Sequence, residues 1–317
     1  MENLLPGMLL QLLQSLLVVL LAPLLTGWVG QCRAWLQNRT GPGLLQPYRT
    51  LRKLFHKDAV IAYNASPIFR VTPYILFGCM WLAAAIIPII AVDLPFSPAA
   101  DVIALVGVFA LARVFIALAA MDIGTAFGSL GARREMLVSF LAEPALIMVL
   151  FTASLISHST QLPRIVGALA HHQFMLYPSL AFAALAFVMV LLAENARIPV
   201  DNPSTHLELT MIHEAMILEY SARHLALIEW ASSLKLFAYI SLGIALFFPL
   251  GIIEAGNWGG LPLALVALLV KMILAGSGLA LLETLLAKMR IFRAPEFLGT
   301  AFLLAVLGLL IHFLLGA

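Results

Sequence analysis

Charged residues and cysteine are scarce in this sequence of 317 residues. Asp, Glu, Lys and Arg make up 11% of the chain, whereas hydrophobic residues make up 62%. The two cysteines, Cys32 and Cys79, are too few for an iron–sulfur cluster, which usually needs four thiolates, and they lack the spacing of a zinc site. The net charge of +2 is too small to indicate a nucleic-acid partner. We therefore expect no metal, no cofactor and no bound nucleic acid in this chain.

Long apolar runs recur along the whole chain, which has a mean hydropathy of +1.03. Runs of about 20 residues with few charges span a bilayer as helix, and these runs are continuous rather than alternating, as strands of a barrel would be. The sequence therefore predicts an all-α integral membrane protein, with one membrane domain over residues 1–317 and about eight transmembrane helices. The predicted spans are 4–29, 73–92, 101–121, 136–157, 176–193, 235–253, 261–283 and 297–316.

The first run, 4–29, has no basic region ahead of it and no small-residue cleavage site, so it predicts a retained span rather than a removed signal peptide. Lysine and arginine in the loops gather after the first, third, fifth and seventh spans, and the opposite loops offer only Arg164. Because such bias marks the cytoplasmic side, we expect these long loops in the cytoplasm and both termini outside.

The first long loop, 30–72, mixes basic residues with aromatic and aliphatic ones. Gly41-Pro42-Gly43 predicts a shaped turn ahead of an apolar and basic segment. That amphipathic pattern suits a helix docked at the membrane interface or on a partner surface. The alternative is a basic loop that only fixes the orientation of the chain.

The loop after the fifth span is rich in acids. Pro199 and Pro203 end the preceding helix, and Asp201 or Asn202 is placed to cap a new helix that starts near Pro203. On that helix Glu208 and Glu219 would share one face, with Glu214 about 120° away. Carboxylates near a membrane interior are costly to ionise and exchange protons near neutral pH, so the loop suggests a proton path.

Two other interpretations of this acidic loop remain. Its carboxylates would simply balance Arg197, Arg223 and the histidines if the loop is solvated. A metal site built from His206, His213 and Glu208 is disfavoured, because the segment lacks the second histidine of the zinc protease pattern.

Ionisable residues inside predicted spans are functional candidates by default. Here they are Arg113, Glu143, Lys271 and Glu283, and Glu143 precedes Pro144, which loosens the local helix. The alternative for Arg113 and Lys271 is a structural ion pair or a side chain that reaches toward the interface. No phosphate-binding glycine loop, nucleophile elbow or cysteine–histidine pair is present, which argues against a self-contained enzyme.

Three stretches carry a resemblance to a known family. They are Asn38-Arg39-Thr40-Gly41-Pro42-Gly43-Leu44-Leu45-Gln46-Pro47, then Gly131-Ala132-Arg133-Arg134-Glu135, then the acidic loop from Glu194 to Tyr220. Nearly the whole chain resembles the subunit 1 family of respiratory complex I. It is more similar to the related membrane subunits of group 4 nickel–iron hydrogenases, of the formate hydrogenlyase subunit 4 and hydrogenase-4 component C type.

The resemblance implies a membrane anchor that docks a peripheral redox arm and links electron transfer to proton or sodium movement. The residues implied or suggested for the coupling route are Glu143, Glu194, Asp201, Glu208, Glu214, Glu219, Lys271, Glu283 and Arg113. Those implied or suggested for docking the arm are Arg39, Gly41, Pro42, Gln46, Arg49, Lys53, Arg133, Arg134, Arg197, Pro199 and Tyr220.

The resemblance also implies partners. These are a hydrogenase large subunit and a small iron–sulfur subunit, which would hold the nickel–iron centre and the iron–sulfur clusters, together with antiporter-like membrane subunits and membrane lipid. The implied location is the cytoplasmic (inner) membrane of a bacterium or archaeon.

Some positions depart from the complex I pattern. Val200, Ser204 and His206 stand where that family has a Phe and an acid-rich run, and about three more residues separate Glu208 from Glu219. These changes favour the hydrogenase branch. The alternatives are a quinone-site subunit of a complex I-type enzyme and an independent ion transporter, although the paired broken helices of many transporters are not evident.

Overall fold

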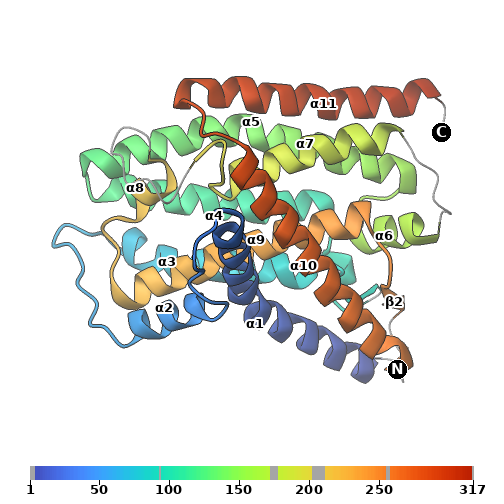
Figure 1. Ribbon diagram of the computed structural model, residues 1–317, viewed down its shortest axis with the longest axis horizontal. Helices are drawn as coiled ribbons and strands as arrows, with labels where there is room; N and C mark the ends of the chain where they lie inside the picture. The colour runs from blue at the N-terminus through green and yellow to red at the C-terminus, as the bar shows by residue number, and fades with distance from the viewer. Residues whose placement is uncertain (1–3, 93, 172–177, 202–210, 255–257, 316–317) are drawn as a thin grey trace.

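The computed structural model describes residues 4–92, 94–171, 178–201, 211–254 and 258–315. Within these residues the chain is a bundle of helices with one short sheet, which confirms the predicted all-α fold class (Figure 1). The helices are α1 (Leu4–Leu36), α2 (Gln46–Phe55), α3 (Pro67–Ile86), α4 (Val102–Asp122), α5 (Ala126–Ser157), α6 (Leu162–His171), α7 (Pro178–Glu194), α8 (His213–Ile217), α9 (Ala222–Phe247), α10 (Leu261–Leu285) and α11 (Ala294–Leu315).

The remaining elements are short. Strands β1 (Ala91–Val92) and β2 (Ile253–Glu254) pair in parallel, with Ala91 opposite Ile253. Three 3-10 turns, η1 (Ser97–Ala99), η2 (Trp258–Gly260) and η3 (Ile291–Arg293), lead into α4, α10 and α11.

Seven helices of the described part are long and apolar enough to cross a membrane: α1, α3, α4, α5, α9, α10 and α11. The eighth predicted span corresponds to α7, which is apolar but has only 17 residues. At 1.5 Å per residue it extends about 25 Å, somewhat less than the hydrocarbon thickness of about 30 Å. Each of the eight predicted segments therefore contains a helix, and α7 is the shortest of them.

The predicted starts of two spans were wrong because hydropathy excludes charged turns. α5 begins at Ala126 rather than 136, where the Thr125 hydroxyl accepts a hydrogen bond from the Gly128 backbone and caps the helix. α9 begins at Ala222 rather than 235. The added turns carry charged residues, of which Glu135 is buried whereas Arg133 and Arg223 are exposed, so polarity alone does not mark where a helix begins.

The predicted ends of the spans 73–92 and 235–253 were also wrong, and proline explains both. α3 ends at Ile86, and Ile87, which precedes Pro88, is extended. α9 ends at Phe247, just before the dipeptide Phe248-Pro249. A residue before proline is disfavoured in the helical conformation, so each helix stops within its apolar run.

Polar side chains from neighbouring helices satisfy the carbonyl groups at these two ends. Gln14 on α1 donates to the carbonyls of Ile87 at 2.9 Å and Ala85 at 3.1 Å, and Gln11 donates to Ala85 at 3.0 Å. Lys271 on α10 donates to the carbonyl of Phe248 at 2.9 Å, and also to that of Leu250. Since helix-end carbonyls lack partners within their own helix, these donors close both ends.

The helices form three groups that share one core. α5, α7 and α11 pack side by side along one edge, while α3, α4 and α9 pack beneath them and α1 lies against α10 (Figure 1). The first turns of α1 and the last turns of α11 lie at the end of the bundle that carries β2, opposite α2 and α8. This arrangement fits the even number of crossings expected from the sequence.

The Gln14 contacts predict a stability effect that can be measured in detergent. Replacing Gln14 by Leu removes a buried donor from two carbonyls, and an unsatisfied buried group costs about 1–3 kcal/mol. We expect a lower thermal unfolding temperature by scanning fluorimetry. The lipid-facing variant Leu16→Ala, whose side chain is exposed, should change it little. Equal temperatures for wild type and Gln14→Leu would contradict the capping role.

Candidate functional site

A cavity of about 340 Å³ lies between α1, α3, α4, α5, α7, α8 and α9. One part of its wall is apolar and includes Leu76, Met80, Phe109, Ile116, Ile217 and Ile228. The other part is charged and includes Arg33, Arg113, Glu135, Glu194, Arg197, Asp201, His213, Glu214, Glu229 and Lys235. A cavity with this division places many ionisable groups at the edge of a low-dielectric core, where their interactions are strong.

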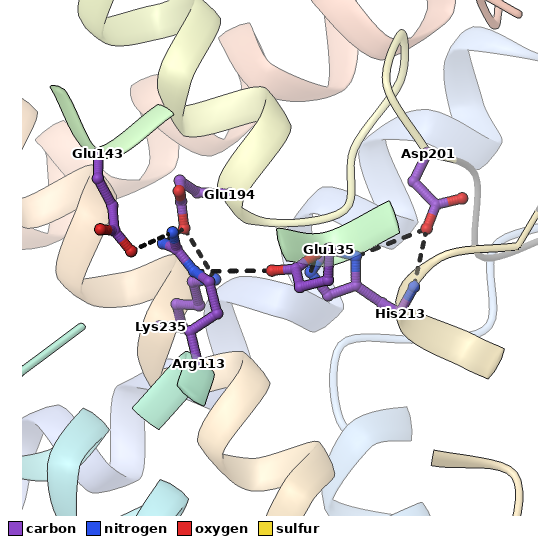
Figure 2. A network of polar contacts seen from close by, with 7 residues as sticks. All are labelled: Arg113, Glu135, Glu143, Glu194, Asp201, His213 and Lys235. Carbon is purple, nitrogen blue, oxygen red and sulfur yellow. Dashed lines mark hydrogen bonds and ion pairs between the residues drawn. The ribbon is translucent and has the colours of Figure 1, made fainter. Parts of the chain in front are cut away.

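Arg113 on α4 is the centre of the charged wall. Its Nη1 lies 2.7 Å from Oε1 of Glu143, its Nη2 bonds to Glu194, and its Nε lies 3.6 Å from Oε1 of Glu135 (Figure 2). The guanidinium group has five donors in a rigid fork, so one side chain can serve carboxylates from two different helices. Only 6% of the Arg113 side chain is exposed. The arginine therefore fastens α4 to α5 and α7 inside the bundle.

Glu194 and Lys235 extend this centre toward α9. Glu194 is the last residue of α7 and is buried, and its carboxylate lies between the Arg113 guanidinium and the Lys235 Nζ, which is 3.1 Å away. A buried carboxylate requires such pairing, because an isolated ionised group would be very costly in the core. Lys235 thus connects the helix that follows the acidic loop to the helix that precedes it.

His213 extends the network in the opposite direction, toward the acidic loop. Its Nε2 lies 3.4 Å from Oε2 of Glu135, and its Nδ1 lies 3.6 Å from Oδ2 of Asp201 (Figure 2). The backbone N–H of His213 also donates to Asp201 at 3.2 Å. Burial lowers the pKa of this imidazole, but Glu135 and Asp201 outweigh burial and raise the pKa above its usual value.

We refer to Arg113, Glu135, Glu143, Glu194, Asp201, His213 and Lys235 as the Arg113 network. Lys288 adjoins it, with its Nζ 3.9 Å from Asp201. A second ion cluster lies beside the same cavity, where Glu283 on α10 accepts from Arg197 at 3.0 Å and lies 3.5 Å from Arg33. Together these contacts bind the end of α10 to the start of the acidic loop.

Local packing explains why α8 presents His213 at this point. Gly131 on α5 faces α8 so closely that a Cβ atom would lie 2.9 Å from the carbonyl oxygen of Ile212. The neighbouring Arg134 donates to the carbonyl of Met211 at 2.8 Å. The backbone N–H of Met289 donates to the carbonyl of Pro199 at 2.9 Å and fixes the other side of the loop. Contacts with α5 therefore hold α8 in position, and the α10–α11 connection holds residues 197–201.

The structure brings together most of the residues predicted for the coupling route. Arg113, Glu143, Glu194 and Asp201 belong to one network, Glu214 lines the same cavity, and Glu283 forms the adjoining cluster. Lys271 does not join them, because it binds the carbonyl groups at the end of α9.

The prediction of one helix carrying both Glu208 and Glu219 was wrong. α8 covers only His213–Ile217, and Glu219 lies in an exposed turn after it. The turn forms because Tyr220 is held by α3, where its ring stacks on Phe69 with centroids 3.9 Å apart and its hydroxyl donates to the Phe69 carbonyl at 3.0 Å. Glu208, Pro203 and His206 lie outside the described residues.

The residues predicted to dock a peripheral arm divide into two groups. Arg197, Pro199 and Tyr220 lie inside the chain, where they hold the acidic loop, and Arg134 binds the carbonyl before α8. Gly41 lies against the Gln31 side chain, which would clash with a Cβ atom. Those whose side chains are exposed are Arg39, Pro42, Gln46, Arg49, Lys53 and Arg133.

Sequence reasoning missed Glu135 and Lys235 as site residues and considered His213 only as a metal ligand. The signal was present, since both missed residues are charges well inside long helices, but the predicted spans began at 136 and at 235 itself. Extending each helix to its capping residues would have placed Glu135 and Lys235 within the bundle. No group of three or more His, Cys, Asp or Glu side chains in the described part is arranged to hold a metal ion.

The chain matches the NADH dehydrogenase family over residues 9–314. It belongs to that family. The formate hydrogenlyase subunit 4 of Escherichia coli K12 is 33% identical over 297 residues, which are 94% of this chain and 96% of the relative. Hydrogenase-4 component C of the same organism is 34% identical over 298 residues, or 94% and 93% of the two chains. The resemblance to the hydrogenase branch is confirmed over nearly the full length.

Complex I-type relatives match a smaller part of the chain. An NADH-quinone oxidoreductase subunit of Rickettsia typhi is 28% identical over 196 residues, which are 60% of this chain and 56% of that relative. Among solved structures, a chain of an archaeal respiratory membrane complex, the membrane-bound sulfane sulfur reductase, matches with a TM-score of 0.79 at 20% identity and covers 95% of this chain and 98% of that one. This family member therefore has the fold of a subunit found in respiratory membrane complexes.

The Arg113 network predicts a non-additive pair of substitutions. Arg113→Gln leaves three carboxylates without their common cation, and breaking a buried pair from one side costs about 3–5 kcal/mol, so we expect a much lower unfolding temperature in detergent. The double variant Arg113→Gln with Glu194→Gln should recover part of the loss. The exposed control Arg223→Gln should behave as wild type. Additive effects in the double variant would contradict a direct pair.

Proposed function

We propose that this chain is the membrane anchor and coupling subunit of a multisubunit, energy-converting hydrogenase. The observation that carries the proposal is the Arg113 network, which runs from Glu143 within a spanning helix to Asp201 in the acidic loop. Ionisable groups inside a membrane domain are costly and are retained where protons or ions move. The network thus offers a continuous electrostatic link between the bundle interior and the loop.

The similarity to named subunits supports the hydrogenase branch. The two hydrogenase relatives cover 94% of the chain, whereas the complex I-type relative covers 60% of it. The nickel–iron centre and iron–sulfur clusters of such a complex would lie in a large and a small partner subunit, and antiporter-like subunits would complete its membrane part. The chain itself would carry out no redox chemistry.

Docking is assigned to the end of the bundle that carries α2 and α8. Arg49 and Lys53 lie on α2, Arg39 lies in the loop before it, and Arg133 lies in the part of α5 that packs on α8; all four side chains are exposed. The concentration of basic residues in these loops supports a position of this end in the cytoplasm of a bacterium or archaeon, with both termini outside. A peripheral arm bound there would lie next to the acidic loop and could act on it directly.

Coupling then follows from the geometry of α8 and its loop. A charge change or a small shift at Asp201 alters the field at His213 and Glu135, and Glu135 shares Arg113 with Glu143 and Glu194. Such a route works only if one element has two positions, and if events at both the loop and the bundle interior shift the balance between them. We assign that part to α8, a five-residue helix whose polar contacts join the loop to α5.

A quinone-site subunit of a complex I-type enzyme is the second candidate. The apolar side of the cavity, with Leu76, Met80 and Phe109, favours it because small-molecule sites combine an apolar wall with a few polar groups.

Tagging this chain and purifying it in a gentle detergent separates these possibilities. The hydrogenase assignment predicts that nickel, iron and a hydrogenase-like large subunit co-purify with the chain. Iron and flavin without nickel would favour the quinone enzyme. Purification of a stable chain without partners would favour an independent transporter.

A substitution at Glu143 tests coupling separately from assembly. Its carboxylate is the partly exposed end of the network, with 33% of the side chain accessible. Glu143→Gln should leave redox turnover with an artificial electron carrier intact and lower ion movement into vesicles by about tenfold or more, because a positioned proton-transfer group contributes at least that much. Glu296→Gln, an exposed acid at the start of α11, is the control. Normal ion movement in Glu143→Gln would exclude this residue from the route.

A further inference from the structure

We propose that His213 is the proton-carrying link between the acidic loop and the Arg113 network, so that its imidazole accepts a proton on the Asp201 side and releases one to Glu135. This inference rests on the proposed coupling function and assigns its transfer step to one side chain. The ring lies between carboxylates that come from different elements, Asp201 from the loop and Glu135 from α5.

The geometry uses both nitrogens of the ring. Nδ1 faces Asp201 at 3.6 Å and Nε2 faces Glu135 at 3.4 Å. An imidazole can gain a proton at one nitrogen and lose one from the other, which an amine with its single nitrogen cannot do. Both separations exceed hydrogen-bond length, so each transfer requires a shift of less than about 1 Å.

The number of protons is conserved in each transfer. A neutral ring with its proton on Nε2 accepts a second proton at Nδ1 from the carboxyl group of Asp201, which must first be protonated and is left ionised, and the ring becomes imidazolium. It then gives the Nε2 proton to the ionised carboxylate of Glu135, which leaves a neutral ring with its proton on Nδ1 and a protonated Glu135. Rotation of the ring or a proton exchange with the cavity restores the first tautomer before the next cycle.

The charges around the ring favour its protonation. From the packed elements, Glu135 of α5, Asp201 of the loop, Glu194 of α7 and Lys235 of α9 act on it, with Lys288 beside Asp201. The Arg113 network contains four carboxylates and two fixed cations, so negative charge is in excess and a proton on His213 reduces that excess. This balance agrees with the raised pKa of His213, to which both carboxylates contribute.

Backbone contacts fix the position of the His213 ring. The N–H of His213 donates to Asp201, and α8 is seated by Gly131 and Arg134 of α5. A movement of the loop that carries Asp201 therefore moves the ring relative to Glu135. A shift of this loop can therefore bring the ring within transfer distance of Glu135 or move it out of reach.

The first test uses the chain alone in lipid nanodiscs with ¹⁵N-labelled histidine. The His213 resonance, assigned from its absence in His213→Gln, should titrate with a pKa that falls by roughly one pH unit in Asp201→Asn and in Glu135→Gln, because each variant removes a charge that stabilises imidazolium. An unchanged pKa in either variant would overturn the two-sided contact. This result does not depend on any partner subunit.

The second test uses the assembled complex in vesicles and compares His213→Gln with His213→Lys. The lysine variant supplies a positive charge but cannot pass a proton between two opposite atoms. We expect both variants to assemble and to keep redox turnover with an artificial carrier, while ion movement per turnover falls at least tenfold and loses its wild-type pH profile. His312→Gln, a buried histidine on α11, is the matched control.

The outcomes separate the two proposals. Full ion movement in His213→Lys would show that the residue serves only as a fixed charge, and this would overturn the relay while leaving the coupling function intact. Ion movement absent from the wild-type complex would instead refute the coupling function, and with it the relay. The nanodisc titration would in that case still decide whether His213 shares its proton with both carboxylates.

Discussion

The guanidinium group of Arg113 is the interaction on which the interior of this bundle depends. It holds two carboxylates of α5 and the terminal carboxylate of α7, and through Glu194 it is joined to Lys235 on α9. Buried ion pairs seldom add stability over an apolar core of the same shape, since desolvation offsets their attraction. Their presence at the meeting point of four helices is therefore better explained by a function that needs charge there than by folding.

The fold could be predicted from the sequence with good accuracy, because each apolar run is long and its length matches a bilayer. The helix boundaries could not, for two physical reasons. Hydropathy stops at charged turns such as Arg133 to Glu135, although the helix runs through them and buries Glu135. It also runs through apolar residues beyond Ile86 and Phe247, where the following prolines end the helices.

The candidate site was predicted only in part. Arg113, Glu143 and Glu194 were recognisable as charges within or at the end of apolar spans, and the structure joins them directly. Which charges pair was not predictable, because Glu135, Lys235 and His213 reach the site from elements distant in sequence. The expected helix through Glu219 failed because Tyr220 stacks on Phe69 of α3, a tertiary contact that local helix propensity does not contain.

Lys271 and Arg113 show why an ionisable residue inside a span needs its neighbours before its role can be assigned. Both are cations within membrane helices, and the sequence alone gives each the same two interpretations. Lys271 meets carbonyl groups at the end of α9, so it has a structural task that any strong donor of that length would perform. Arg113 meets three carboxylates, and a proton on any one of them changes its pairing with the other two. Only the second arrangement can pass on a change of charge, and it is the one that lies against the cavity and the acidic loop.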